Sequence, residues 1–286
     1  MGLISLLIAL AAENKLTAKV WQFNFYYNLY IGLLNKAKFS STAWSSNSIV
    51  VFVVLLPVLV VYSIDHFLNE ALLSFVFSTL ILVVCFGCAA ARACYKAYLS
   101  AAFEGDQVSC DIHEQQLRAG RNCEASDDTE GCLSFGQTLM WINYRYYFAI
   151  MLFFIVFGAA GAVFYRLLVT VAEKRETEGD SFSDKNVQFA NHLLFYIEWL
   201  PVRIASLGYM FVGHFGKAMP IWLENLFDVD MKPQQFLAKV SKASEDFMID
   251  DADCTAEPCL LVRLAKRNML LFLAITALMT LSGTVA

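Results

Sequence analysis

Charged residues are scarce in this sequence. Only 16% of its 286 residues are charged and 58% are hydrophobic, and the mean hydropathy is +0.53. Soluble domains average about 25% charged and about 45–50% apolar residues. The apolar residues also occur in long runs, whereas a soluble core would space them along amphipathic elements. The composition therefore excludes an ordinary soluble domain and predicts an integral membrane protein.

Motifs of nucleotide and hydrolytic chemistry are also absent. The sequence contains no Gly-x-x-x-x-Gly-Lys-Ser/Thr loop, no Gly-x-Gly-x-x-Gly turn, no Gly-x-Ser-x-Gly elbow and no His-Glu-x-x-His pair. Basic residues form no stripe that could follow phosphates, and the net charge is −5. We therefore expect no nucleic-acid partner, and a function carried by less specific groups of polar residues.

The eight cysteines do not form a regular framework. Several lie in or beside an apolar run, where cysteine behaves as a small hydrophobic residue. A zinc site could be assembled from Cys110, His113, Cys123 and Cys132, but these four residues contain none of the close Cys-x-x-Cys pairs that structural zinc sites use. We expect reduced thiols and no metal centre.

Four segments are long and apolar enough to cross a bilayer: 48–64, 71–93, 146–172 and 268–285. Pro57 inside the first segment is tolerated if neighbouring groups satisfy the carbonyl that it frees. A short polar turn joins the first two segments, so they should form an antiparallel hairpin.

A fifth segment, 195–215, is apolar but carries Glu198, Arg203 and His214, with Pro201 between the first two. Each charge at the bilayer centre costs about 2.5–3.5 kcal/mol, so this segment must face protein or water, or break near the proline. The Lys and Arg residues that flank the spans all fall on the cytoplasmic side only if it crosses. The predicted fold is thus an all-α polytopic membrane bundle of four to five spans, the fifth kinked near Pro201.

This topology divides the chain into six regions. They are an N-terminal part with a short apolar helix packed on the bundle and an interfacial helix (1–47), a transmembrane hairpin (48–93), a cytoplasmic region (94–145), a transmembrane pair (146–215) with an external loop (173–191), a second cytoplasmic region (216–267) and a C-terminal transmembrane helix (268–286).

The strongest polar group is Glu198 with Arg203. A carboxylate and a guanidinium within a membrane segment suggest a ligand site or an ion-pair switch, and the alternative is a bidentate bridge that locks a broken helix to the bundle. His214 and Lys217 follow at a turn that leaves the membrane. They could contact an anionic headgroup or phosphate, although a structural histidine is the favoured interpretation of His214.

Two further groups are candidates. Glu104-Gly105-Asp106 could hold Mg²⁺ between two carboxylates, or the glycine could simply terminate a helix. The run from Trp141 to Tyr147 includes Asn143 and Arg145. It is typical of an aromatic belt at the membrane surface, and these two polar residues are also candidates for ligand contact.

These residues carry a family resemblance. WINYRYYFA at 141–149, EWLPVRIASLGYMFVGHFGKAMPIW at 198–222, AYLSAA at 97–102 and the opening apolar segment resemble the AmpE family. The resemblance implies a multi-pass protein of the bacterial inner membrane that regulates β-lactamase and the response to antibiotic. Besides the lipid bilayer, it implies a cell-wall-derived ligand or a partner protein.

The AmpE family is in turn similar to the CbiB/CobD family of membrane enzymes, which use ATP to form an amide. Gly105-Asp106-Gln107, Asn143 and the segment 201–204 echo that family's motifs, but Tyr146 and Tyr147 stand where that family has Asp-Gly. Such an enzyme needs acids to hold Mg²⁺ and position phosphate. The resemblance therefore favours a binding protein without catalysis, and an amide-forming enzyme with Mg-ATP as cofactor is the alternative. A small-solute transporter is disfavoured because no inverted repeat is present.

Overall fold

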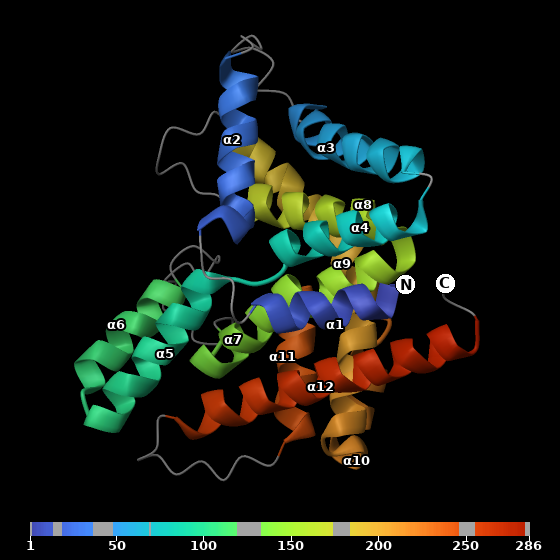
Figure 1. The fold of residues 1–286 in the computed structure, drawn as a ribbon. Helices are drawn as coiled ribbons and strands as arrows, with labels where there is room; N and C mark the ends of the chain where they lie inside the picture. Colours follow the sequence, from blue (N-terminus) through green and yellow to red (C-terminus); the bar gives the residue numbers. More distant parts are fainter. Residues whose placement is uncertain are drawn as a thin grey trace. The chain divides into compact units, whose positions relative to one another are not determined.

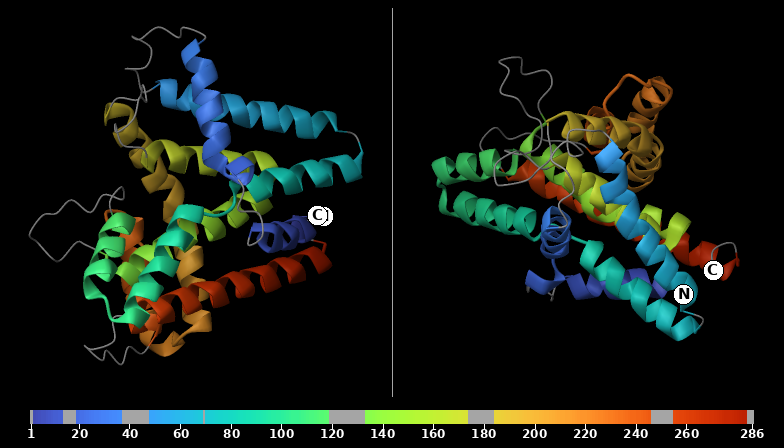
Figure 2. Two further views of the ribbon diagram at one scale, coloured as in Figure 1. Left: turned by 60° about the vertical axis from the view of Figure 1, so that its left-hand side comes forward. Right: turned by 90° about the horizontal axis from the view of Figure 1, so that it is seen from above.

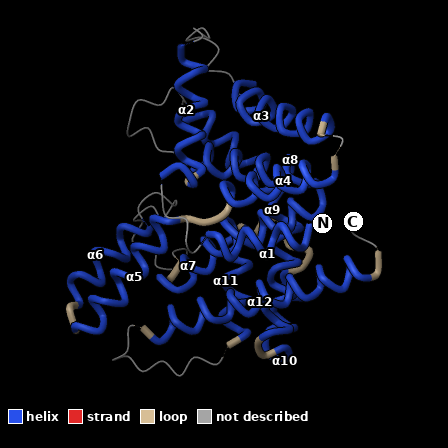
Figure 3. Tube along the Cα trace, in the orientation of Figure 1, coloured by secondary structure: helices blue, strands red, loops and turns tan. Residues whose placement is uncertain are grey.

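The computed structural model describes residues 2–13, 19–36, 48–68, 70–118, 133–173, 184–245 and 255–283. These residues form helices joined by short loops and contain no strand (Figure 3). The predicted all-α class is confirmed. The chain divides into two compact units, the first made of Met1–Gly87, Ala149–Leu194 and Thr276–Ala286, and the second of Cys88–Phe148 and Phe195–Ile275.

The first unit is built on one long helix, α8 (Ala149–Glu173). Helices α3 (Ser48–Phe67) and α4 (Ala71–Cys85) both pack against α8, and α1 (Gly2–Glu13) lies along α4 (Figure 1). The helix α1 is the short apolar helix predicted at the N-terminus, and its packing on the bundle is confirmed. The segment predicted as an interfacial helix holds the short helix η1 (Lys19–Trp21) and α2 (Phe23–Lys36).

Pro57 interrupts the hydrogen bonds of α3 without breaking the helix. Proline has no N–H, so the carbonyl four residues earlier, that of Val53, loses its helical donor. The hydroxyl of Tyr30 on α2 donates to this carbonyl at 3.2 Å. Burial raises the pKa of Tyr30 to about 12, so the hydroxyl keeps its proton at physiological pH. A neighbouring side chain thus satisfies the freed carbonyl, as the sequence predicts.

Tyr30→Phe removes the hydroxyl that donates to the Val53 carbonyl and keeps the aromatic ring. We expect it to lower the free energy of unfolding by about 1–3 kcal/mol, the cost of leaving a buried acceptor unpaired. Chemical denaturation in detergent measures the change. Tyr26→Phe is the matched control, because Tyr26 is 42% exposed on the same helix. Equal stability of the two variants would show that the bond to Val53 contributes nothing.

The second predicted span, 71–93, is not one helix. The helix α4 ends at Cys85, and a new helix, α5 (Ala89–Glu104), begins four residues later. Gly87 between them has a φ of +84°, which favours glycine. A Cβ atom at this position would also collide with the Glu13 carboxylate at the end of α1. The break therefore depends on a contact with a distant segment, which the apolar pattern does not reveal.

The third predicted span begins earlier than expected. Residues Phe135–Glu173 form one helical run, made of α7 (Phe135–Asn143), a π-helix η3 (Tyr144–Phe148) and α8. Ser134 starts α7 with a capping box, accepting from the Gln137 N–H at 3.2 Å. Inside α8, Gly158 adopts a φ of +68°. The helix is therefore kinked at Gly158.

The second unit contains the π-helix η3 and the helices from α5 to α7 and from the second half of α9 onward. The helices α5 and α6 (Gln107–Arg118) form a hairpin (Figure 2), and both α6 and α11 (Pro233–Ser244) contact α7. The helix α10 (Phe215–Asn225) packs on α11. Most of α12 (Ala256–Leu281) and the second half of α9 (Asp184–Val212) complete this unit.

Within the described residues, three helical segments are long and apolar enough to cross a membrane: α3, the run Phe135–Glu173, and α12. Helices α4 and α5 together make a fourth if they form one broken span. The predicted fifth span, 195–215, is not among them, because Glu198 and Arg203 lower its mean hydropathy. It lies in α9, which continues through Pro201 to Val212. The count of five and the orientation argument built on it are not supported.

Two helices extend beyond the predicted membrane segments. The helix α9 begins at Asp184, so the last part of the predicted external loop 173–191 is helical. The helix α12 begins at Ala256, twelve residues before the predicted start of the last span at residue 268.

Candidate functional site

A buried ion pair joins the π-helix η3 to α9 in the second unit. The Nε of Arg145 donates to Oε1 of Glu198 at 2.9 Å, and Nη2 donates to Oε2 at 3.1 Å. The two side chains are only 8% and 2% exposed. The indole of Trp141 lies 4.7 Å from the guanidinium and covers one face of it. This two-point fork is the strong, geometrically specific form of the interaction.

The sequence groups Glu198 with Arg203, but the structure gives the two side chains different partners. The two residues are five positions apart on one helix, which turns their side chains about 140° away from each other. Glu198 therefore meets the cation of another helix, Arg145, which lies 53 positions away in sequence. Of the alternatives, the bidentate bridge is present, but it joins two continuous helices because α9 does not break at Pro201.

Arg203 anchors the end of α10. Its Nε donates to the Leu226 carbonyl at 2.6 Å, and its Nη2 donates to the Asp228 carbonyl at 2.8 Å. Its Nη1 donates to the Trp199 carbonyl at 2.9 Å. The rings of Trp199 and Phe236 lie on the guanidinium at 4.0 and 4.8 Å. A cation at the C-terminal end of a helix satisfies carbonyls that have no helical donor, so Arg203 is a structural anchor.

Two polar atoms beside Arg145 have no protein partner. Among the described residues, Nε1 of Trp141 and Oδ1 of Asn143 are buried and make no hydrogen bond. Both residues precede Arg145 by one helical turn or less. A buried donor or acceptor without a partner is costly and calls for an explanation. Together with the ion pair, these atoms offer a donor, an acceptor and a charged fork.

The aromatic residues around this site are buried, not arranged as a surface belt. Trp141, Tyr144 and Tyr146 are 2%, 0% and 5% exposed. The Trp141 and Tyr144 rings stack at 5.1 Å, and Phe148 continues the row to Phe272 of α12 at 4.7 Å. The prediction of a membrane-surface belt is therefore wrong. The spacing of 141, 144 and 148 is that of a buried helix face, and this signal could have placed Arg145 in the interior.

His214 and Lys217 are both exposed at the start of α10. The His214 N–H donates to the Ser244 carbonyl at 2.7 Å, which ties the end of α9 to the end of α11. Phe215, Met219 and Leu223 are also exposed on α10. Apolar residues and a nearby lysine on one short helix suit a membrane interface. Contact of His214 and Lys217 with an anionic headgroup or phosphate stays a prediction.

Comparison with known proteins identifies the family. The family model described as "Regulatory signalling modulator protein AmpE" matches residues 1–286. This chain belongs to the AmpE family. A curated relative, Protein AmpE of Shigella flexneri, is 28% identical over 213 residues, which cover 71% of this chain and 72% of the relative. No solved structure matches the chain.

Membership of the AmpE family fits the helical segments described above. The chain is a multi-pass protein of the bacterial inner membrane and belongs to a family of regulatory signalling modulators. The comparisons give no support to the alternative of a CbiB-type enzyme. Both segments that carry the resemblance most strongly, 141–149 and 198–222, contribute to the Arg145–Glu198 site or its surroundings.

Asp106, the candidate magnesium ligand, caps a helix. Gly105 ends α5 in the left-handed conformation, with a φ of +74°. One Asp106 oxygen accepts from the Ser109 N–H at 3.2 Å, and the other accepts from its hydroxyl at 2.5 Å. These bonds lower the pKa of the Asp106 carboxyl. The helix-terminus interpretation of Glu104–Asp106 is therefore the one that the structure supports.

The part of the chain that the structure describes contains no group of three or more His, Cys, Asp or Glu side chains arranged to hold a metal ion. Cys123 and Cys132 of the imagined zinc site lie outside the described residues.

Asp106→Ala removes the cap of α6, whereas Asp106→Asn keeps an acceptor at the same place. We expect the alanine variant to have the lower midpoint of thermal unfolding at pH 7. The lowered pKa means that the cap stabilises the fold above the ordinary aspartate pKa of about 3.9, and that this contribution is lost as the pH falls through the folded-state value.

Thermal unfolding in the presence of Mg-ATP distinguishes a binding protein from an amide-forming enzyme. We expect millimolar Mg-ATP to leave the midpoint of the unmodified protein unchanged. A ligand at 100 times its dissociation constant would add about 2.7 kcal/mol, which is readily seen. A stabilisation by Mg-ATP that disappears in Asp106→Ala and Asp106→Asn would support the enzyme instead.

Proposed function

We propose that this AmpE-family protein modulates β-lactamase signalling by binding a polar ligand, or a polar group of a partner protein, beside the Arg145–Glu198 pair. The observation that carries the proposal is this buried fork in a π-helix, with the unpartnered atoms of Trp141 and Asn143 next to it. Single π-turns inside α-helices are frequent at functional sites. Ionisable residues in membrane segments are costly and are usually retained for function.

The chemistry of the pair suggests how binding is relayed. A ligand carboxylate can replace the Glu198 carboxylate at the Arg145 fork, because both present the same two oxygens. Cell-wall fragments carry carboxylates and amides, and the amide would find the Trp141 N–H and the Asn143 carbonyl oxygen. Such a ligand shifts the balance between a paired and an unpaired state only by its difference in affinity for the two. Replacing the Glu198 carboxylate by that of the ligand would then change the contact between the two helices that carry Arg145 and Glu198.

The residues that an amide-forming enzyme would need have structural roles. Asp106 caps α6 and Arg203 anchors the end of α10. This supports a binding protein without a catalytic step.

The experiment replaces the chromosomal gene and measures β-lactamase activity after exposure to a β-lactam. We expect deletion to change the level of induction, and Glu198→Gln to reproduce part of that change at normal abundance in the membrane. Glutamine keeps the shape of the side chain but removes the charge that holds Arg145.

The matched control lies in the same unit. Glu114 and Arg118 form a surface ion pair on α6 with side chains 28% and 30% exposed, so Glu114→Gln should behave as the unmodified protein. If Glu198→Gln also induces as the unmodified protein does, the pair is not the signalling element.

A further inference from the structure

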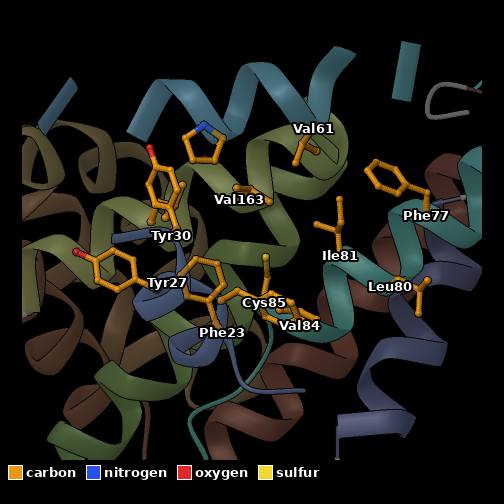
Figure 4. A pocket seen from close by; sticks show the side chains of 13 residues that line it. Phe23, Tyr27, Tyr30, Val61, Phe77, Leu80, Ile81, Val84, Cys85 and Val163 are labelled. Atoms are coloured by element: carbon orange, nitrogen blue, oxygen red, sulfur yellow. The ribbon is translucent and has the colours of Figure 1, made fainter. Parts of the chain in front are cut away.

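The first unit contains a pocket that the proposed function does not use. It has a volume of about 430 Å³ and is lined by residues of α2, α3, α4 and α8. Figure 4 shows Val61 of α3 and Phe77 and Ile81 of α4 facing the same space. The volume falls within the range of about 300–1,000 Å³ that is usual for small-molecule sites.

The surface of the pocket is almost wholly apolar. Tyrosines of α2 line part of it, but the Tyr30 hydroxyl donates to the Val53 carbonyl and the Tyr27 hydroxyl is buried, and Cys85 of α4 adds one thiol (Figure 4). The remaining lining, from α3, α4 and α8, is hydrocarbon or aromatic ring. An apolar cavity of this kind stays free of water and takes apolar molecules. The lining thus fits a hydrocarbon chain.

The surroundings supply such molecules. The wall helix α3 is a candidate span, and its outer residues Val51, Leu55 and Leu59 are 40–61% exposed. Their medium is therefore the hydrocarbon of the bilayer. The pocket opens to it, because the lining runs from buried Cys85 and Val163 to Leu80, which is 46% exposed. A helix rich in tyrosine at the pocket's end suits the headgroup level, where amphipathic rings collect.

We propose that this pocket binds one hydrocarbon chain of a membrane lipid, with the chain between α3 and α4 and the polar end beside the tyrosines of α2. Phospholipid acyl chains and polyprenyl chains share this chemistry. The site is independent of the Arg145–Glu198 pair, since every lining residue belongs to the first unit.

Photo-crosslinking in lipid nanodiscs tests the proposal. Two probes are used in parallel, a phosphatidylethanolamine with a diazirine on one acyl chain and a polyprenyl phosphate with a diazirine on its chain. We expect one of them to label peptides 77–85 and 57–61 saturably as its fraction rises, and the probe that does so identifies the source. Labelling that rises without saturation for both probes is ordinary bilayer contact and would overturn the proposal.

A pair of matched variants on α4 gives a second criterion. Val84 lines the pocket, whereas Val76 is 50% exposed on the same helix. Val84→Trp fills the space and should weaken the saturable labelling about tenfold, while Val76→Trp should leave it unchanged. Equal labelling of both variants would contradict the proposal. The saturation measured on the unmodified protein decides the question if Val84→Trp does not fold.

Discussion

Glu198→Leu is expected to lower the free energy of unfolding by about 3–5 kcal/mol, the usual cost of removing one partner of a buried ion pair. The variant leaves the Arg145 guanidinium in the interior of the second unit without its carboxylate. The Trp141 ring covers one face of the guanidinium but cannot accept the two N–H bonds that Glu198 accepts. Chemical denaturation in detergent, followed by tryptophan fluorescence, measures the change.

The double variant Arg145→Leu/Glu198→Leu separates the charge from the packing. Replacing both members of a buried pair by apolar residues of similar size is often neutral or stabilising, so we expect the double variant to recover most of the loss. Glu114→Leu on the surface of α6 should have little effect, because exposed pairs contribute about 0–1 kcal/mol. A Glu198→Leu variant as stable as the unmodified protein would show that Arg145 is not held by this carboxylate.

Arg203→Leu is expected to lower the free energy of unfolding by about 2–4 kcal/mol and to loosen the segment after α10. The side chain donates to three carbonyls and lies between two rings. Each hydrogen bond to a charged group contributes a net of about 1.5–3 kcal/mol, and bonds within one network are not additive. Hydrogen–deuterium exchange of residues 222–230 should increase in the variant.

Arg203→Lys is the informative control. Lysine keeps the charge but lacks the planar fork that reaches Trp199, Leu226 and Asp228 together, so its effect should be intermediate. Unchanged exchange in residues 222–230 in the leucine variant would mean that α10 is held by its packing on α11 alone.

The sequence predicts the helices more reliably than it predicts the residues at which they begin and end. Long apolar runs predict α3, α8 and α12, because few other structures bury such segments in lipid. The need for a substitute donor at Pro57 also follows from local chemistry. The end of α4 does not, because it depends on Gly87 meeting Glu13 from the opening helix. The start of the third helical run at Phe135 was missed because residues 135–145 mix polar and apolar side chains.

The site could be predicted only in part. Glu198 and Arg203 stand out because charges within apolar segments are rare and costly. Which cation meets Glu198 depends on the angle between side chains on α9 and on the packing of a helix 53 positions away. The π-helix at Tyr144–Phe148 leaves no evident mark in the residue pattern. Asp106 resembled a metal ligand because a capping carboxylate and a magnesium carboxylate look alike in sequence.

The double variant Arg145→Leu/Glu198→Leu also tests the central claim, that the buried pair carries the signal. The measurement is β-lactamase activity after exposure to a β-lactam, in cells whose only copy of the gene encodes this variant at normal abundance. We predict a stable protein in the membrane and the induction level of the deletion strain. Induction equal to that of the unmodified protein would contradict the account and reduce the Arg145–Glu198 pair to a structural bridge.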